Sequence, residues 1–212
     1  MKNSLPIVKI ITLILICISF VSCKKDRITT SFDINNPKGY AIVMTMNRDY
    51  PEPLIAVFSS ENKLTYASIS TYGNSTFKVE GNELVLNDDG EELRFTLKND
   101  KITAHSNRLK TAVLIKVPDE NQLLGKTFTG TYYNTNGSVL HQNFFYTFGS
   151  FNNEANVGYT IGNVVRTENY TPFGNVAAFI RHNGIEFIIK MPDGSIVSNY
   201  RNNIGTSYGI FK

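Results

Sequence analysis

Three two-residue turn signals between residues 75 and 105 place the strongest constraint on how this chain folds. They are Gly81-Asn82, Asp89-Gly90 and Asn99-Asp100, and such pairs are typical of tight β-hairpins. Pairing outward from these turns places the following residues opposite one another: Val79 and Leu84, Phe77 and Leu86, Leu86 and Leu93, Leu84 and Phe95, Leu97 and Ile102, and Phe95 and Ala104. All three registers put apolar side chains on one face, whereas a shift of one residue would turn them to water. The sequence therefore predicts a four-stranded antiparallel meander.

The rest of the chain, from residue 39 onward, has the same character. Short apolar stretches alternate with turn signals, and no long stretch shows helical spacing, which is typical of all-β proteins. Residues 118–124 form a predicted linker between two stretches of similar length, 39–117 and 125–212. We therefore expect an all-β fold in which antiparallel meanders form either two small β-domains or one sandwich or barrel of lipocalin-like type.

Two further turn signals near the C-terminus place an acidic residue between two basic ones. Pairing outward from Asn183-Gly184 sets Arg181 opposite Glu186, and pairing outward from Asp193-Gly194 sets Glu186 opposite Arg201. This arrangement predicts a surface ion triad that fixes strand register. The alternative, a catalytic carboxylate, is less favoured because no second acid is found nearby in the sequence.

The N-terminal end carries a targeting signal. An apolar stretch, residues 10–21, follows two lysines and is shorter than the roughly 20 residues needed to cross a bilayer. The sequence Phe20-Val21-Ser22-Cys23, followed by a polar run, resembles the lipobox of bacterial lipoproteins. The resemblance implies a signal peptide over residues 1–22 and acyl chains such as palmitate on Cys23, which anchor the protein to a membrane. An ordinary secretory signal and an uncleaved anchor are the alternatives.

The residues after Cys23 bear on location. Residues 23–38 are polar and lack a clear period, so we expect the lipidated cysteine to be followed by a tether. The run Ser22 to Asp26 resembles leaders of Bacteroidota lipoproteins, and Lys24 stands where many lipoproteins of the inner membrane have Asp. The resemblance implies an outer-membrane lipoprotein that faces either the periplasm or the cell surface.

The composition of the processed chain excludes several partners. Removal of Lys2 and Lys9 with the leader leaves 19 Lys and Arg against 18 Asp and Glu, so little net charge remains. Lysine and arginine are not clustered, so we expect no nucleic-acid partner. Cys23 is the only cysteine after residue 22, which excludes an intrachain disulfide and a metal site built from thiolates.

The stretch from Thr127 to Phe148 contains the candidate binding face. The turn signal Asn136-Gly137 sets Tyr132 opposite His141, Gly130 opposite Asn143, and Phe128 opposite Phe145. Neither face of this hairpin is purely apolar or purely polar, although a half-buried hairpin usually separates the two. Tyrosine rings stack on ligands while amides give directed hydrogen bonds. We therefore select four candidate ligand-binding residues: Tyr132, Asn134, His141 and Asn143.

Two local sequences in this region resemble β-barrel families. Residues 129–134, Thr-Gly-Thr-Tyr-Tyr-Asn, resemble the opening of an avidin-type barrel, in which the positions of Asn134 and Ser138 contact biotin. That family's pocket tryptophans have no counterpart, because this chain has no Trp. Residues 123–128, Leu-Leu-Gly-Lys-Thr-Phe, resemble a lipocalin opening. Both resemblances imply a β-barrel, and we expect no cofactor.

The sequence contains none of the usual catalytic signatures. It has no phosphate-binding glycine loop, no His-Glu-x-x-His and no Gly-x-Ser-x-Gly, so we expect no enzyme, no catalytic residue and no metal site. The leading hypothesis is a lipid-anchored β-protein of the cell envelope with a binding or interaction role. The alternatives are a lipocalin-like carrier of a small ligand or glycan, and a structural subunit that binds another envelope protein.

Overall fold

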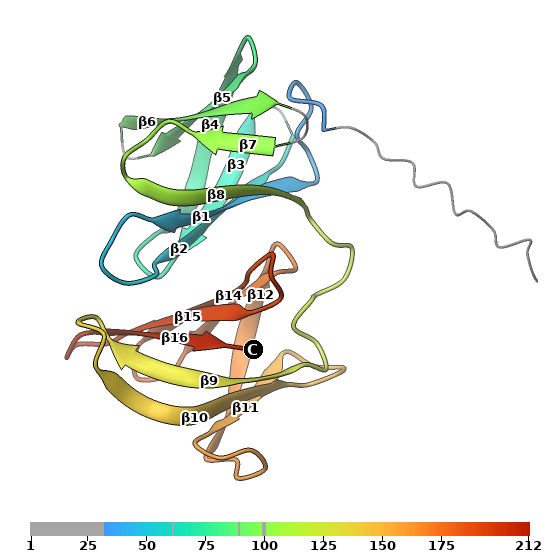
Figure 1. The fold of residues 1–212 in the computed structure, drawn as a ribbon. Coiled ribbons are helices and arrows are strands. Elements are labelled where there is room, and N and C mark those ends of the chain that lie inside the picture. Colours follow the sequence, from blue (N-terminus) through green and yellow to red (C-terminus); the bar gives the residue numbers. More distant parts are fainter. Residues whose placement is uncertain (1–31, 61, 89, 99–100) are drawn as a thin grey trace, which may run out of the picture. The chain divides into compact units, whose positions relative to one another are not determined.

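The computed structural model (Figure 1) describes residues 32–60, 62–88, 90–98 and 101–212. Within these ranges every strand pairs antiparallel, and there is no helix, so none that could cross a membrane. The prediction of an all-β fold is therefore confirmed. The predicted signal peptide, the lipidation site Cys23 and most of the tether lie outside the described residues.

The N-terminal half forms one eight-stranded sheet in the order β7-β6-β5-β4-β3-β2-β1-β8. Its strands are β1 (Tyr40–Met46), β2 (Pro53–Phe58), β3 (Lys63–Ser68), β4 (Tyr72–Glu80), β5 (Glu83–Asp88), β6 (Glu91–Lys98), β7 (Lys101–Ala104) and β8 (Leu109–Lys116). Figure 1 shows this sheet curling so that β7 approaches β8. Apolar side chains from its strands, including Ile42, Leu84 and Phe95, fill the inside of the curl.

The predicted four-stranded meander is confirmed pair by pair. Phe77 pairs with Leu86 across β4 and β5, and Leu86 pairs with Leu93 across β5 and β6. Phe95 pairs with Ala104 across β6 and β7. The turn residues Asp89, Asn99 and Asp100 lie outside the described residues, but the registers on both sides of them agree with two-residue turns.

The C-terminal half closes into a barrel in the order β10-β11-β12-β13-β14-β15-β16-β9. Its strands are β9 (Thr127–Asn134), β10 (Val139–Phe148), β11 (Glu154–Gly158), β12 (Arg166–Phe173), β13 (Ala177–Arg181), β14 (Ile185–Lys190), β15 (Ile196–Arg201) and β16 (Thr206–Phe211). Closure comes from β16, which pairs with β15 on one side and with β9 on the other. A closed barrel leaves no free strand edge, which stabilises an antiparallel sheet of this length.

One end of the barrel is filled by apolar side chains. Phe128, Phe148 and Ile196 belong to a buried cluster inside the barrel, and the rings of Phe128 and Phe148 meet edge to face with their centroids 6.1 Å apart. Leu123, which the sequence places in a linker, is fully buried in the same cluster. The residues before β9 therefore contribute to the barrel core.

A third apolar cluster contains residues from both sheets. Val43 and Ile55 of the N-terminal sheet contribute to it, together with Phe187 and Ile189 of β14. Residues 32–212 accordingly form one compact unit. This packing explains why β14 buries both of its faces, one inside the barrel and one against apolar side chains of the N-terminal half.

The predicted registers on both sides of β14 are wrong by one residue. Arg181 pairs with Ile185 across a three-residue loop, in which Asn183 has a positive φ of 51°, whereas the prediction assumed a two-residue turn. Glu186 consequently lies opposite Ile180 and Tyr200 instead of Arg181 and Arg201. Because a shift of one residue exchanges the faces of a strand, Glu186 is 3% exposed inside the barrel, and the predicted surface ion triad does not form.

The hairpin of β9 and β10 follows the predicted register only at one pair. Tyr132 pairs with His141 as expected, but two irregularities in β10 shift the rest, so Gly130 faces Phe144 and Phe128 faces Tyr146. Asn143 lies at the second irregularity with a positive φ of 57°, a conformation that Asn tolerates better than most residues. This bulge turns the side chains of Phe144 and Tyr146 into the barrel.

Candidate functional site

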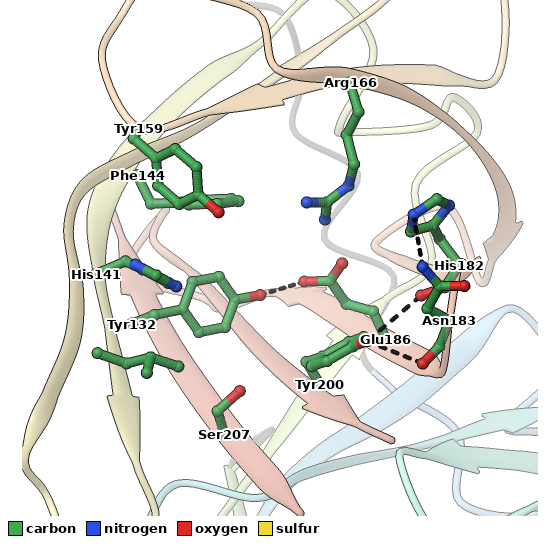
Figure 2. A pocket seen from close by; sticks show the side chains of 11 residues that line it. Tyr132, His141, Phe144, Tyr159, Arg166, His182, Asn183, Glu186, Tyr200 and Ser207 are labelled. Atoms are coloured by element: carbon green, nitrogen blue, oxygen red, sulfur yellow. Dashed lines mark hydrogen bonds between the residues drawn. The ribbon is translucent and has the colours of Figure 1, made fainter. Parts of the chain in front are cut away.

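The end of the barrel opposite Phe128, Phe148 and Ile196 contains a cavity of about 280 Å³ (Figure 2). Tyr132 and Tyr200 come from the C-terminal parts of β9 and β15, whereas His141, Arg166 and Glu186 come from the N-terminal parts of β10, β12 and β14. Neighbouring strands are antiparallel, so these positions meet at the same rim. The cavity therefore follows directly from the topology of the barrel.

Glu186 is the central polar group of this site. Its Oε1 atom accepts hydrogen bonds from the hydroxyls of Tyr132 and Tyr146, and from Oγ of Ser198 at 2.6 Å. All four side chains are buried. A buried carboxylate is costly unless donors surround it, and three hydroxyls from β9, β10 and β15 provide them here.

The hydroxyls in this network also contact one another. The Tyr132 hydroxyl lies 2.7 Å from Oγ of Ser198 and within hydrogen-bonding distance of the Tyr146 hydroxyl. Each hydroxyl has a single proton, so not all of these contacts are hydrogen bonds at the same time. The arrangement in which each hydroxyl donates to Glu186 uses all three protons, and it fixes the carboxylate in one position.

Burial and the neighbouring carboxylate keep both phenols protonated. Burial is the largest cause that raises the pKa of Tyr132 well above its ordinary value of 10.0, and the negative charge of Glu186 adds to it. The same two causes, in the same order, raise the pKa of Tyr146 well above 10.0. Both tyrosines are therefore hydrogen-bond donors to Glu186 over the physiological pH range.

A second polar group lies beside the first. Nε of Arg166 donates to Oε1 of Glu168, which is buried, and Nδ1 of His182 lies 3.5 Å from the same oxygen. Burial alone would lower the pKa of Arg166, but the hydrogen bond to Glu168 and the charge of Glu186 outweigh it and raise this pKa. Arg166 is therefore a fixed cation that is held by Glu168.

The structure brings two of the four predicted ligand-binding residues to the cavity. Tyr132 and His141 line it, and the imidazole of His141 lies 4.8 Å from the ring of Tyr159. Asn134 is not part of the lining and donates to Oγ of Ser138 beside the hairpin turn. Asn143 is exposed at a different surface depression, because the bulge in β10 turns it away from the barrel interior.

Sequence reasoning missed most of the polar residues of the site. The sequence pattern predicts a surface position for Glu186. It also gives none of the following residues as a candidate for the site: Arg166, Glu168, Tyr146 and Ser198. The structure shows Arg166, Glu168 and Tyr170 to be inward-facing and at least half-buried along β12. In the sequence, their alternation with the small polar residues Thr167, Asn169 and Thr171 was the available signal. Among all the residues that the structure describes, there is no group of three or more His, Cys, Asp or Glu placed to hold a metal ion.

Comparisons with protein families, with curated proteins and with solved structures found no match to this chain. The case for a site therefore rests on the geometry of the barrel. That geometry gives a cavity that is open at the rim, closed by apolar side chains at the other end, and lined by a fixed carboxylate, a fixed guanidinium and aromatic rings.

Proposed function

We propose that this protein is a lipid-anchored, non-enzymatic binding protein of the cell envelope, and that its barrel binds a small ligand at the Glu186 end. The cavity carries this proposal, because it is the part of the barrel interior that apolar side chains leave unfilled. Pockets for drug-sized ligands measure roughly 300–1,000 Å³, so a volume of about 280 Å³ suits one small molecule. A carrier of a small ligand is the lipocalin-like alternative that the sequence predicts beside the leading hypothesis.

The membrane part of the proposal depends on the leader. The resemblance of residues 20–23 to a lipobox supports acylation of Cys23, and the residues after it support the outer membrane. Mass spectrometry of the protein purified from its native host should find acyl chains on Cys23 and no residues before it. An unmodified cysteine, or a leader still attached, would contradict the anchor without touching the barrel.

Binding is tested by ligand-induced stabilisation. A ligand that binds only the folded state raises the midpoint of thermal unfolding, so a panel of small metabolites should contain compounds that shift it. Leu140→Trp puts a large side chain into the lining and should abolish the shift. Val139→Trp is the matched control, since Val139 precedes Leu140 on β10, is exposed, and lies outside the lining. A shift that persists in Leu140→Trp would refute this site.

The non-enzymatic part has its own support. Oε1 of Glu186 is held by three hydroxyls and Glu168 is held by Arg166, which suits fixed binding groups better than a pair that exchanges protons with a substrate. A panel of glycoside and ester substrates should show no turnover. Hydrolysis that is lost in Glu186→Gln would overturn this part of the proposal.

A structural subunit remains the second candidate, and one observation favours it. Ile161, Val164 and Val165, in the connection between β11 and β12, are exposed apolar side chains. Clustered apolar residues on a surface often mark a protein contact. A stable partner that co-purifies with the protein, and that is lost when these three residues are changed to Ser, would favour this candidate over the carrier.

A further inference from the structure

Glu186 presents an unused hydrogen-bond acceptor to the cavity. The three hydroxyls all donate to Oε1, and no described residue donates to Oε2. Among fully enclosed side-chain oxygens and nitrogens of the described residues, only Oδ1 of Asn199 lacks a partner. Oε2 is therefore not fully enclosed, and since Glu186 lines the cavity, this oxygen faces it.

Arg166 presents unused donors from the opposite side. Its Nε is bonded to Glu168, but in the part of the chain that the structure describes neither terminal nitrogen has a hydrogen-bond partner. Figure 2 shows the guanidinium pointing toward the carboxylate of Glu186. Among the described residues no ion pair joins these two groups, and both line the cavity, so a ligand in the cavity can contact both.

The charges at this end disfavour a charged ligand. Two buried carboxylates, Glu168 and Glu186, face the one half-buried guanidinium of Arg166, which is paired with Glu168. An anion approaching Arg166 would meet the free oxygen of Glu186, and a cation approaching Glu186 would meet Arg166. A hydroxyl group both donates and accepts, so neighbouring hydroxyls of a neutral molecule satisfy both sides together.

Aromatic rings complete the recognition surface. The ring of Tyr159 lies 5.5 Å from Phe144, edge to face, and its side chain is 44% exposed at the mouth of the cavity. Aromatic faces pack well against the apolar faces of ring-shaped ligands. Resting on the proposed binding function, we infer that the cavity takes a neutral, polyhydroxylated ligand about the size of one sugar ring.

Titration calorimetry with matched sugars tests this inference. The full chain, in a detergent without sugar head groups, is titrated with the methyl glycosides of glucose, galactose and mannose, and with the corresponding uronates and amino sugars. We expect at least one neutral glycoside to bind, and its uronate and amino counterparts to bind at least about tenfold more weakly. Equal or tighter binding of a charged counterpart would overturn the inference while leaving a small-ligand site in place.

Two variants locate the contacts. Glu186→Gln replaces the free acceptor oxygen by an amide that is able to donate a hydrogen bond. It should therefore weaken binding of the neutral glycoside and reduce the difference in affinity between this glycoside and its uronate. Tyr159→Ala removes a partly exposed ring, so it should weaken binding of the glycoside by about tenfold without unfolding the barrel. Tyr72→Ala, at an exposed tyrosine of β4 outside the lining, should leave the affinity for the glycoside unchanged. If no sugar binds, the inference is wrong, and the metabolite panel with Leu140→Trp decides separately whether the binding function stands.

Discussion

The N-terminal sheet and the barrel each contain eight antiparallel strands, but their interiors are filled differently. The buried cluster of the N-terminal sheet consists of Leu, Ile, Phe, Met and Ala. A pocket lined by Met44, Leu54 and Leu93 of this cluster measures only about 10 Å³, roughly what one water molecule needs. The barrel encloses Glu168, Glu186, Ser198 and a cavity of about 280 Å³. Eight antiparallel strands therefore do not by themselves produce an interior cavity with polar walls.

Whether such a cavity is present depends on the side chains that point inward at one rim. In β5 and β6 the inward positions are Leu84, Leu86, Leu93 and Phe95, and they interlock. At the rim of the barrel the inward positions include Glu186 and Arg166, which need polar partners and cannot interlock with apolar side chains. A polar rim therefore keeps space open that an apolar core closes.

The largest contrast is expected from truncating one leucine in each half. Leu84→Ala removes a fully buried side chain, and it should lower the free energy of unfolding by about 2–5 kcal/mol. Leu140→Ala, at the cavity mouth and 43% exposed, should change stability by much less and should instead alter ligand affinity. Chemical denaturation of both variants measures the difference. Equal losses would mean that the two interiors are packed alike.

The polar network of the barrel should respond to partial and complete replacement in opposite ways. Glu186→Leu leaves three buried hydroxyls without their acceptor, and it should cost about 1–3 kcal/mol or more. Adding Tyr132→Phe and Tyr146→Phe removes two of the orphaned donors and should recover part of the loss. Denaturation of the single and triple variants forms the test. A triple variant less stable than Glu186→Leu would show that the tyrosine hydroxyls have other partners.

Alkaline pH should weaken the barrel through its two buried phenols. Burial first, and then Glu186, raises the pKa of Tyr132 and Tyr146 well above 10.0, whereas both ionise near 10 in the unfolded chain. Above that pH the unfolded state binds fewer protons than the native state, so stability falls as pH rises, by about 1.4 kcal/mol per pH unit for each tyrosine. Below pH 10 these two groups add no pH dependence.

Denaturation at several alkaline pH values measures this slope. The Tyr132→Phe, Tyr146→Phe double variant should show a shallower decline than the unsubstituted protein, while Tyr72→Phe, which removes an exposed hydroxyl of β4, should keep the full decline. An unchanged slope in the double variant would mean that these phenols ionise in the native state.

The smallest effect is expected at the surface of the N-terminal sheet. Arg94 and Lys78 form ion pairs with Glu80 and Glu92, at N–O distances of 2.7–2.8 Å, and all four side chains are well exposed to solvent. Exposed pairs contribute little and are screened by salt. Glu80→Gln should therefore leave the unfolding midpoint almost unchanged at high salt, in contrast to Glu186→Leu. A large drop in the unfolding midpoint would mean that this exposed network stabilises the protein as much as the buried network around Glu186.

How far the sequence predicts this fold depends on the turns. The registers of β4 to β7 were predictable for two reasons: the flanking pairs fit two-residue turns, and one register places most of the apolar residues on a single face. These residues are Phe77, Val79, Leu84, Leu86, Leu93, Phe95 and Leu97. Around β14 the same reasoning failed, because the loop at Asn183 has three residues and both faces of β14 are buried. With apolar residues on both faces, the pattern no longer shows which register is correct.

The candidate site was predictable only where one hairpin determines it. Tyr132 and His141 are cross-strand partners next to the Asn136-Gly137 turn, so local pairing placed them together. Arg166 and Glu186 come from strands that are far apart in sequence and are brought to one rim by closure of the barrel. Local pairing contains no information on that closure, and the bulge at Asn143 has no clear signal in the sequence.

Amide NMR of the labelled protein, recorded with and without a saturating neutral methyl glycoside, tests the central claim most directly. We predict that the resonances that shift belong to the rim of the barrel, around Tyr132, His141, Arg166 and Glu186, while those of residues 40–116 keep their positions. Shifts centred on the N-terminal sheet, or no shifts at any attainable concentration, would contradict it.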